Sequence, residues 1–143
     1  METQETYDAW FRQMIVRQCP ALFDTIESRE HNGITYTVAV RNDPRGDQYC
    51  ITLSTYGREL TPACKALHCH FDQFDFDDHE EEFLNAINWI NNLMGDKIVI
   101  FTKMTGDRVL SAIAAEPAYK VAPSDGEHIE VFSFSGTLDR TIK

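Results

Sequence analysis

The stretch "HNGITYTVAV", His31–Val40, contains the clearest strand signal in this chain of 143 residues. Its Asn–Gly pair favours a tight hairpin turn, because both residue types tolerate a positive φ angle. After the turn, large apolar or aromatic residues alternate with threonine and alanine, as in a half-buried strand with one polar face. We therefore expect a hairpin here, within an antiparallel sheet.

Further strand signals lie on the C-terminal side of this hairpin. The turn "NDPRGD" leads into an alternating segment, and a second hairpin is predicted where "TGD" separates two apolar runs. A fourth strand is left open around residues 66–72. The other expected strands are "QYCITLS" (48–54), "KIVIFTK" (97–103), "RVLSAIAAE" (108–116) and "HIEVFSFS" (128–135), the last followed by a short polar tail.

Two segments have the apolar period of an amphipathic helix. The first runs from Thr6 to Cys19, and Pro20 marks its end. The second is expected to begin at Asp77 or Asp78 and to end at Met94. A capping box is predicted at its start, and Gly95 is the expected terminating residue. The apolar stripes are Tyr7, Trp10, Phe11, Met14 and Ile15 in the first helix, and Phe83, Ile87, Ile90 and Met94 in the second.

These elements predict an α+β fold in the order α-β-β-β-(β)-α-β-β-β. An antiparallel sheet of about five to seven strands, with the two helices packed on it, would cover the apolar stripes. At 143 residues, we expect a single domain covering residues 1–143.

The net charge is −10, and it is concentrated in one part of the chain. Between Ala66 and Asp96 there are eight acidic residues and no Lys or Arg. Such a segment repels a phosphate backbone and attracts a basic protein, so we expect a basic protein partner and no direct nucleic-acid binding. The chain has no apolar run long enough for a membrane helix and no secretory signal at its acidic N-terminus. We therefore expect no membrane association and a cytoplasmic protein with reduced cysteines.

The acidic stretch Cys64–Phe83, "CKALHCHFDQFDFDDHEEEF", and the helix that it leads into form the candidate binding surface. Acids in the first turn of a helix stabilise it, yet capping explains two or three of the carboxylates and not the rest. The expected contact residues are the acids Asp75, Asp77, Asp78, Glu80, Glu81 and Glu82, the amides Asn85, Asn88 and Asn92, and the aromatic residues Phe74 and Phe76.

The same stretch also contains a candidate metal site. On a strand, His68, His70 and Asp72 lie on one face with their imidazoles about 6–7 Å apart, where a transition metal fits between them. His79 is a further candidate ligand. Zinc held by His68 and His79 together with Cys64 and Cys69 is a variant of this site. Under the leading interpretation no cofactor is expected.

The His-x-His-x-Asp run resembles the His-x-His-x-Asp-His motif of metallo-β-lactamase-fold hydrolases. His68, His70 and Asp72 match that motif, and Gln73 stands in place of its last histidine. The resemblance implies a metal-dependent hydrolase, with these residues as ligands.

We expect a non-catalytic binding or inhibitor protein, in character like the small acidic immunity proteins that neutralise bacterial toxins. The alternative is the metal-dependent hydrolase. A further alternative is a secretion-chaperone-like protein, because those chaperones resemble this chain in opening with a helix followed by strands. The sequence leaves the oligomeric state open, a homodimer included.

Overall fold

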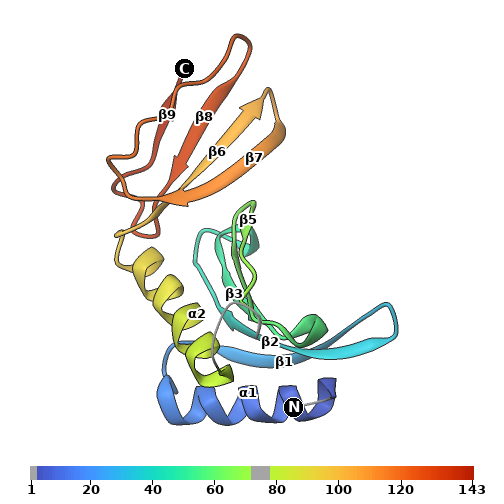
Figure 1. Ribbon diagram of the computed structural model, residues 1–143. Coiled ribbons are helices and arrows are strands. Elements are labelled where there is room, and N and C mark those ends of the chain that lie inside the picture. The colour runs from blue at the N-terminus through green and yellow to red at the C-terminus, as the bar shows by residue number, and fades with distance from the viewer. Residues whose placement is uncertain (1–2, 72–77) are drawn as a thin grey trace. The chain divides into compact units, whose positions relative to one another are not determined.

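The computed structural model describes residues 3–71 and 78–143. These residues contain two α-helices and two antiparallel sheets, of five and four strands (Figure 1). The α+β class is confirmed, as is the order of a helix, a set of strands, a second helix and a second set of strands. Where we expected one sheet, the strands before and after the second helix form two. Short connections favour pairing within each set, and the helix separates the sets along the chain.

The elements have the following bounds. The helices are α1 (Gln4–Gln18) and α2 (His79–Met94), with short 3₁₀ helices η1 (Asp47–Tyr49) and η2 (Tyr56–Arg58). The first sheet has the spatial order β1 (Thr25–His31), β2 (Ile34–Arg41), β3 (Ile51–Ser54), β4 (Thr61–Cys64) and β5 (Leu67–His68). The second has the order β7 (Arg108–Ala115), β6 (Val99–Thr105), β8 (His128–Phe132) and β9 (Arg140–Ile142).

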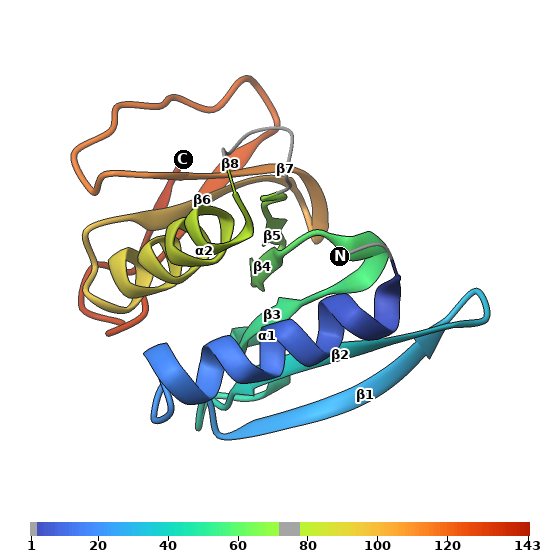
Figure 2. The same cartoon turned by 60° about the horizontal axis from the view of Figure 1, so that its bottom comes forward.

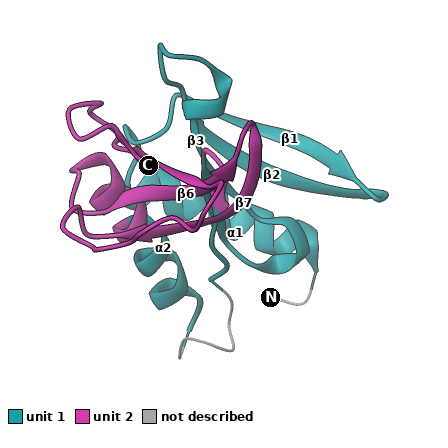
Figure 3. Ribbon diagram, turned by 90° about the horizontal axis from the view of Figure 1, so that it is seen from above, with its two compact units in different colours: residues 1–64, 68–87 teal, residues 65–67, 88–143 magenta. Residues whose placement is uncertain are grey.

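The chain divides into two compact units, which Figure 3 shows in different colours. The first contains residues 1–64 and 68–87, and the second contains residues 65–67 and 88–143. The boundary falls inside α2. That residues 1–143 form a single domain stays a prediction. Neither helix in the described ranges combines the length and the apolar character that crossing a membrane requires.

In the first unit, α1 begins at a capping box and packs on β2 (Figure 2). The Thr3 hydroxyl accepts from the Thr6 backbone N–H at 3.1 Å, and the Thr6 hydroxyl accepts from the Thr3 N–H at 3.3 Å. Four members of the predicted stripe are buried and Trp10 is half-buried, so the apolar face is confirmed. The buried residues are Tyr7, Phe11, Met14 and Ile15.

The β1–β2 hairpin has the predicted turn. Asn32 and Gly33 both have positive φ angles, 52° and 76°, and His31 pairs with Ile34. Along β2, however, all four residues from Thr37 to Val40 are buried, so the expected polar face does not extend along the whole strand. The polar backbone there is satisfied: the Thr37 N–H donates to the Thr55 hydroxyl at 3.0 Å.

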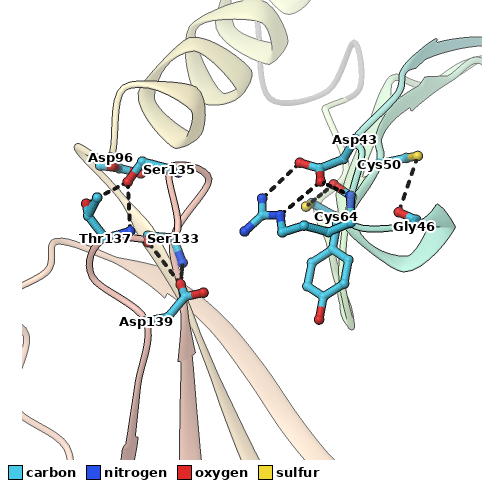
Figure 4. Close-up of polar contacts among 11 residues, drawn as sticks. Asp43, Gly46, Cys50, Cys64, Asp96, Ser133, Ser135, Thr137 and Asp139 are labelled. Carbon is cyan, nitrogen blue, oxygen red and sulfur yellow. Dashed lines mark hydrogen bonds and ion pairs between the residues drawn. The ribbon is translucent and has the colours of Figure 1, made fainter.

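The strand expected at residues 48–54 begins later than predicted. Residues Asp47–Tyr49 form η1, and β3 starts at Ile51. In the loop before η1, the Asp43 carboxylate accepts from the Arg45 side chain at 2.8 and 2.9 Å (Figure 4). These hydrogen bonds hold the pKa of the Asp43 carboxyl below its usual value. The alternation of apolar and polar residues that predicted a strand from residue 48 does not distinguish an extended segment from such a hydrogen-bonded loop.

Helix α2 has its predicted apolar stripe, with Phe83, Ile87 and Ile90 buried. It ends in a Schellman motif, in which the Lys97 N–H donates to the Asn92 carbonyl at 2.9 Å. The left-handed residue of that motif is Asp96, with φ 56°, and not the glycine that precedes it. Aspartate is one of the few non-glycine residues that adopt this conformation readily.

In the second unit, the predicted hairpin joins β6 and β7, and four residues of β6 and β8 form the core. The polar tail adds a short strand that we did not expect: β9 pairs with β8, and Ile142 packs on the core. Asp139 fixes the turn between these strands by accepting from the Ser133 N–H at 2.6 Å and hydroxyl at 2.9 Å (Figure 4). The core residues are Val99, Phe101, Ile129 and Val131.

Candidate functional site

The first turn of α2 begins at Asp78, as the capping pattern predicts. The Asp78 carboxylate accepts from the Glu81 backbone N–H at 2.7 Å, and the Asp78 carbonyl accepts from the Glu82 N–H at 3.1 Å. This carboxylate satisfies a backbone donor that would otherwise lack a partner. Asp78 is nevertheless exposed, so its carboxylate is also accessible to a binding partner.

The three glutamates that follow differ in their surroundings. Glu80 and Glu81 are exposed, whereas Glu82 has no solvent exposure. Consecutive residues of a helix project about 100° apart, so three successive side chains span more than half of its circumference, and one of them can lie on the packed side. Glu82 belongs to the row that continues with Ala86 and Trp89, which borders the apolar stripe. Glu82 is therefore not accessible to a binding partner.

Glu82 is held by a tyrosine and a histidine. The Tyr7 hydroxyl donates to one carboxylate oxygen, and the other lies 2.9 Å from the His79 Nδ1. Burial raises the pKa of the Tyr7 phenol, and the hydrogen bond to the neighbouring carboxylate raises it further. Trp10 stacks beside both rings, with centroid distances of 5.1 Å to Tyr7 and 5.5 Å to His79. This cluster fixes the start of α2 to α1.

The exposed face of α2 carries one large apolar residue among polar ones. Leu84 is 45% exposed and lies four positions after Glu80, three after Glu81 and four before the exposed Asn88, which places all four on one side of the helix. Asn85 is half-buried, and its side chain donates to the Glu81 carbonyl at 2.8 Å.

Leu84 was not among the contact residues predicted from the sequence. Its position lies in the row of asparagines and not on the apolar stripe of Phe83, Ile87 and Ile90. An apolar residue off the stripe indicates an exposed side chain, and the sequence pattern contains this signal. Of the other expected contact residues, Asn92 is half-buried. Four further ones lie outside the described residues: Phe74, Asp75, Phe76 and Asp77.

Two exposed acids at the start of α2 have no basic side chain paired with them among the described residues. Within residues 3–71 and 78–143, neither Asp78 nor Glu80 forms an ion pair with a lysine or an arginine. Asp78 and Glu80 thus keep their negative potential toward solvent.

Of the predicted metal ligands, the structure brings His68 and His70 together. Their rings meet edge to face with centroids 4.9 Å apart, although the strand β5 ends at His68 and His70 lies beyond it. The His70 Nδ1 lies 2.6 Å from a Glu59 carboxylate oxygen, and His79 faces Glu82 instead. Asp72 lies outside the described residues. Within the described ranges, the structure forms no group of three or more His, Cys, Asp or Glu side chains placed to hold a metal ion. The hydrolase therefore stays a prediction.

The four cysteines are all among the described residues, and none of them forms a disulfide there. Cys64 is buried, and its thiol donates to the Tyr49 carbonyl at 3.6 Å, while the Cys50 thiol lies 3.8 Å from the Gly46 carbonyl (Figure 4). Burial raises the pKa of the Cys19 and Cys69 thiols, which disfavours the nucleophilic thiolate. The cysteines that were candidate zinc ligands thus behave as packed or weakly hydrogen-bonded side chains.

A groove of about 570 Å³ lies along α1, where Asp8 and Arg12 face Ser28, Thr35 and other residues of β1 and β2. Two of the charged side chains that line it, Asp8 and Arg12, already have partners. The Asp8 carboxylate accepts from the Thr55 hydroxyl at 2.6 Å, and Arg12 donates to the Ser28 hydroxyl at 3.3 Å. The groove arises from the packing of a helix on a strand pair, so no motif in the sequence marks it.

Comparison with known proteins adds no family to this description. No family model matches the chain, and it shows no significant similarity to a curated protein or to a solved structure.

Proposed function

We propose that this chain is a non-catalytic binding protein whose helix α2 docks onto a basic protein. The contact surface, which we call the α2 face, consists of Asp78, Glu80, Glu81 and Leu84. The observation that carries the proposal is the exposed leucine beside three exposed acids, Asp78, Glu80 and Glu81. An interface needs a desolvated apolar centre as well as charges at its rim, and this face has both.

The charge of the α2 face favours a basic partner. Clustered carboxylates repel one another, and a cationic surface that approaches them relieves this repulsion. The same attraction accelerates the encounter of the two proteins at low ionic strength. A basic nuclease or toxin inhibited by this chain is the partner class that such a surface fits.

The Tyr7–Glu82–His79 cluster supports the proposal through preorganisation. It fixes the turn from which Asp78, Glu80 and Glu81 project, so little backbone freedom is lost when a partner binds. Ordering a mobile segment would otherwise reduce the affinity.

The test uses a charge-neutralised variant of the α2 face, Asp78→Asn/Glu80→Gln/Glu81→Gln. Asparagine caps a helix about as well as aspartate, so the helix start is preserved. A partner is first recovered from the native host by pull-down at low salt and identified. We then expect the association rate with the variant to fall at least about tenfold at low salt and to lose most of its ionic-strength dependence.

The matched control neutralises three exposed acids elsewhere, as Glu27→Gln/Glu30→Gln/Asp47→Asn. It changes the net charge equally, and we expect a much smaller effect on the rate. Equal effects of the two triple variants, or recovery of partners without basic character, would contradict the proposal. Leu84→Ala provides a second readout, because loss of the apolar centre should accelerate dissociation without changing the association rate.

A further inference from the structure

Strand β7 is an edge strand of the second sheet. It pairs with β6 on one side, and no other described strand lies on its outer side (Figure 1). An edge strand presents unpaired backbone donors and acceptors, and proteins usually protect such edges with charged side chains or very short strands. β7 is eight residues long and carries three exposed apolar side chains: Val109, Leu110 and Ile113, which are 47%, 41% and 41% exposed.

The edge strand β1 of the first sheet provides an internal comparison. It is seven residues long and presents exposed Glu27, Arg29 and Glu30 to solvent. Those charges oppose the docking of another strand. The two edge strands are of similar length, but β1 presents charged side chains and β7 presents apolar ones. Of the two, β7 therefore favours pairing with another strand.

We propose that β7 pairs with β7 of a second copy of this chain, antiparallel about a two-fold axis through Ala112. In an antiparallel pair, hydrogen-bonded and non-hydrogen-bonded positions alternate, so a two-fold axis must pass through a residue and not between two. This restricts self-pairing to a few registers, which the side chains then distinguish.

The register centred on Ala112 places large side chains opposite small ones. In this register Ile113 faces Ser111 of the second copy and Leu110 faces Ala114. Beyond the bulge at Leu110 the strand is offset by one residue, so Val109 lies between Ala114 and Ala115 of the second copy, and Arg108 is a near neighbour of Glu116 and not directly opposite it. The long arginine side chain spans this offset at the end of the strand, which gives two complementary charge pairs by symmetry. Moving the axis to Ser111 places Val109 opposite Ile113 and leaves both charges unmatched. Moving it to Ile113 places that residue opposite itself and Leu110 opposite Glu116.

The charges that form these pairs are available. Arg108 and Glu116 are both exposed, and neither forms an ion pair within residues 3–71 and 78–143. Although the chain carries a net charge of −10, the hairpin from Val99 to Glu116 has two basic and two acidic residues. This hairpin is locally neutral, so a second copy meets less repulsion there than at the acidic segment, and the repulsion that remains comes from the net charge of the two chains.

A β-bulge modifies one end of β7 without preventing the pairing. Ser111 pairs with Lys103 and Val109 pairs with Met104, so Leu110 has no counterpart on β6. Ser111 to Ala115, which span the proposed axis, keep the regular register. The long arginine side chain at position 108 accommodates an offset of one residue at the bulged end.

The test combines sedimentation velocity with charge reversal. We expect the unmodified chain to show a monomer–dimer equilibrium across a concentration series. Arg108→Glu and Glu116→Arg, each alone, place like charges opposite each other twice. Each should therefore raise the dimer dissociation constant at least about tenfold. The double variant Arg108→Glu/Glu116→Arg restores both pairs and should recover the original value.

Mixing the two single variants gives the most specific result. One copy then carries two acids at these positions and the other two bases, so the mixture should form a heterodimer although each variant alone is monomeric. Arg29→Glu on β1 makes the same charge change on an exposed edge and should leave the equilibrium unchanged. Circular dichroism verifies that each variant is folded. A chain that stays monomeric throughout, or a dimer insensitive to the reversals and their mixture, would overturn the proposal.

Discussion

Glu82 is a carboxylate without solvent exposure, and its hydrogen bonds with Tyr7 and His79 show how the fold accommodates it. A buried carboxylate is costly unless it is hydrogen-bonded, so its partners are needed for stability. At the scale of single residues, the contact between Tyr7 and Glu82 is therefore expected to contribute most among the polar contacts described above.

Replacing Tyr7 with phenylalanine tests this contribution. Tyr7→Phe keeps the ring and removes the hydroxyl that donates to Glu82, leaving the buried oxygen without this donor. We expect the free energy of unfolding to fall by about 2 kcal/mol, measured by urea denaturation at pH 7. Tyr36→Phe serves as the control, because Tyr36 is half-buried and its hydroxyl forms no hydrogen bond within the described residues. We expect it to change the stability by less than about 0.5 kcal/mol.

The same variant should change the response to alkaline pH. The pKa of Tyr7 is raised in the folded state, whereas in the unfolded chain it is about 10. Above about pH 10 the unfolded state releases a proton that the folded state retains, so this contribution to stability is present below that pH and is lost as the pH rises. The free energy of unfolding should therefore decrease less steeply above pH 10 in Tyr7→Phe. Identical slopes in the two proteins would show that Tyr7 ionises normally.

At the scale of elements, α2 depends on its N-terminal cap. The Asp78 carboxylate accepts from the Glu81 N–H, and its charge also interacts favourably with the helix dipole. Asp78→Ala should lower the free energy of unfolding by about 1 kcal/mol, whereas Asp78→Asn, which caps about as well, should lower it by a few tenths at most. Urea denaturation of both variants measures the difference. Equal losses would mean that the charge and not the cap stabilises the helix.

At the scale of the whole molecule, the net charge of −10 acts in opposite directions on the two proposed contacts. Salt screens the attraction between the acidic α2 face and a basic partner. It also screens the repulsion between two copies, whose β7 hairpins are locally neutral. From low to physiological salt, binding of the partner should weaken and self-association should strengthen. Isothermal titration calorimetry and sedimentation velocity at several salt concentrations measure the two trends. The same direction in both would contradict the assignment of separate surfaces.

The sequence by itself determined the features that depend on near neighbours along the chain. The turn at Asn32 and Gly33, the stripes of α1 and α2, the Asp78 cap and the hairpin of β6 and β7 all follow from local periodicity and turn chemistry. The α+β order follows from them, because elements pack according to their apolar faces. The alternation that predicted a strand from Gln48 failed because a 3₁₀ turn with local hydrogen bonds competes with extension there.

Only the tertiary structure decided which side chains of a given type are buried and which strands share a sheet. Glu80, Glu81 and Glu82 are equivalent in composition, yet the last meets a tyrosine hydroxyl 75 positions away in the chain. The exposure of Leu84, the pairing of β9 with β8 and the separation of nine described strands into two sheets likewise depend on contacts between distant segments. Local patterns do not record such contacts, because burial is set by what packs against a residue and not by its neighbours in sequence.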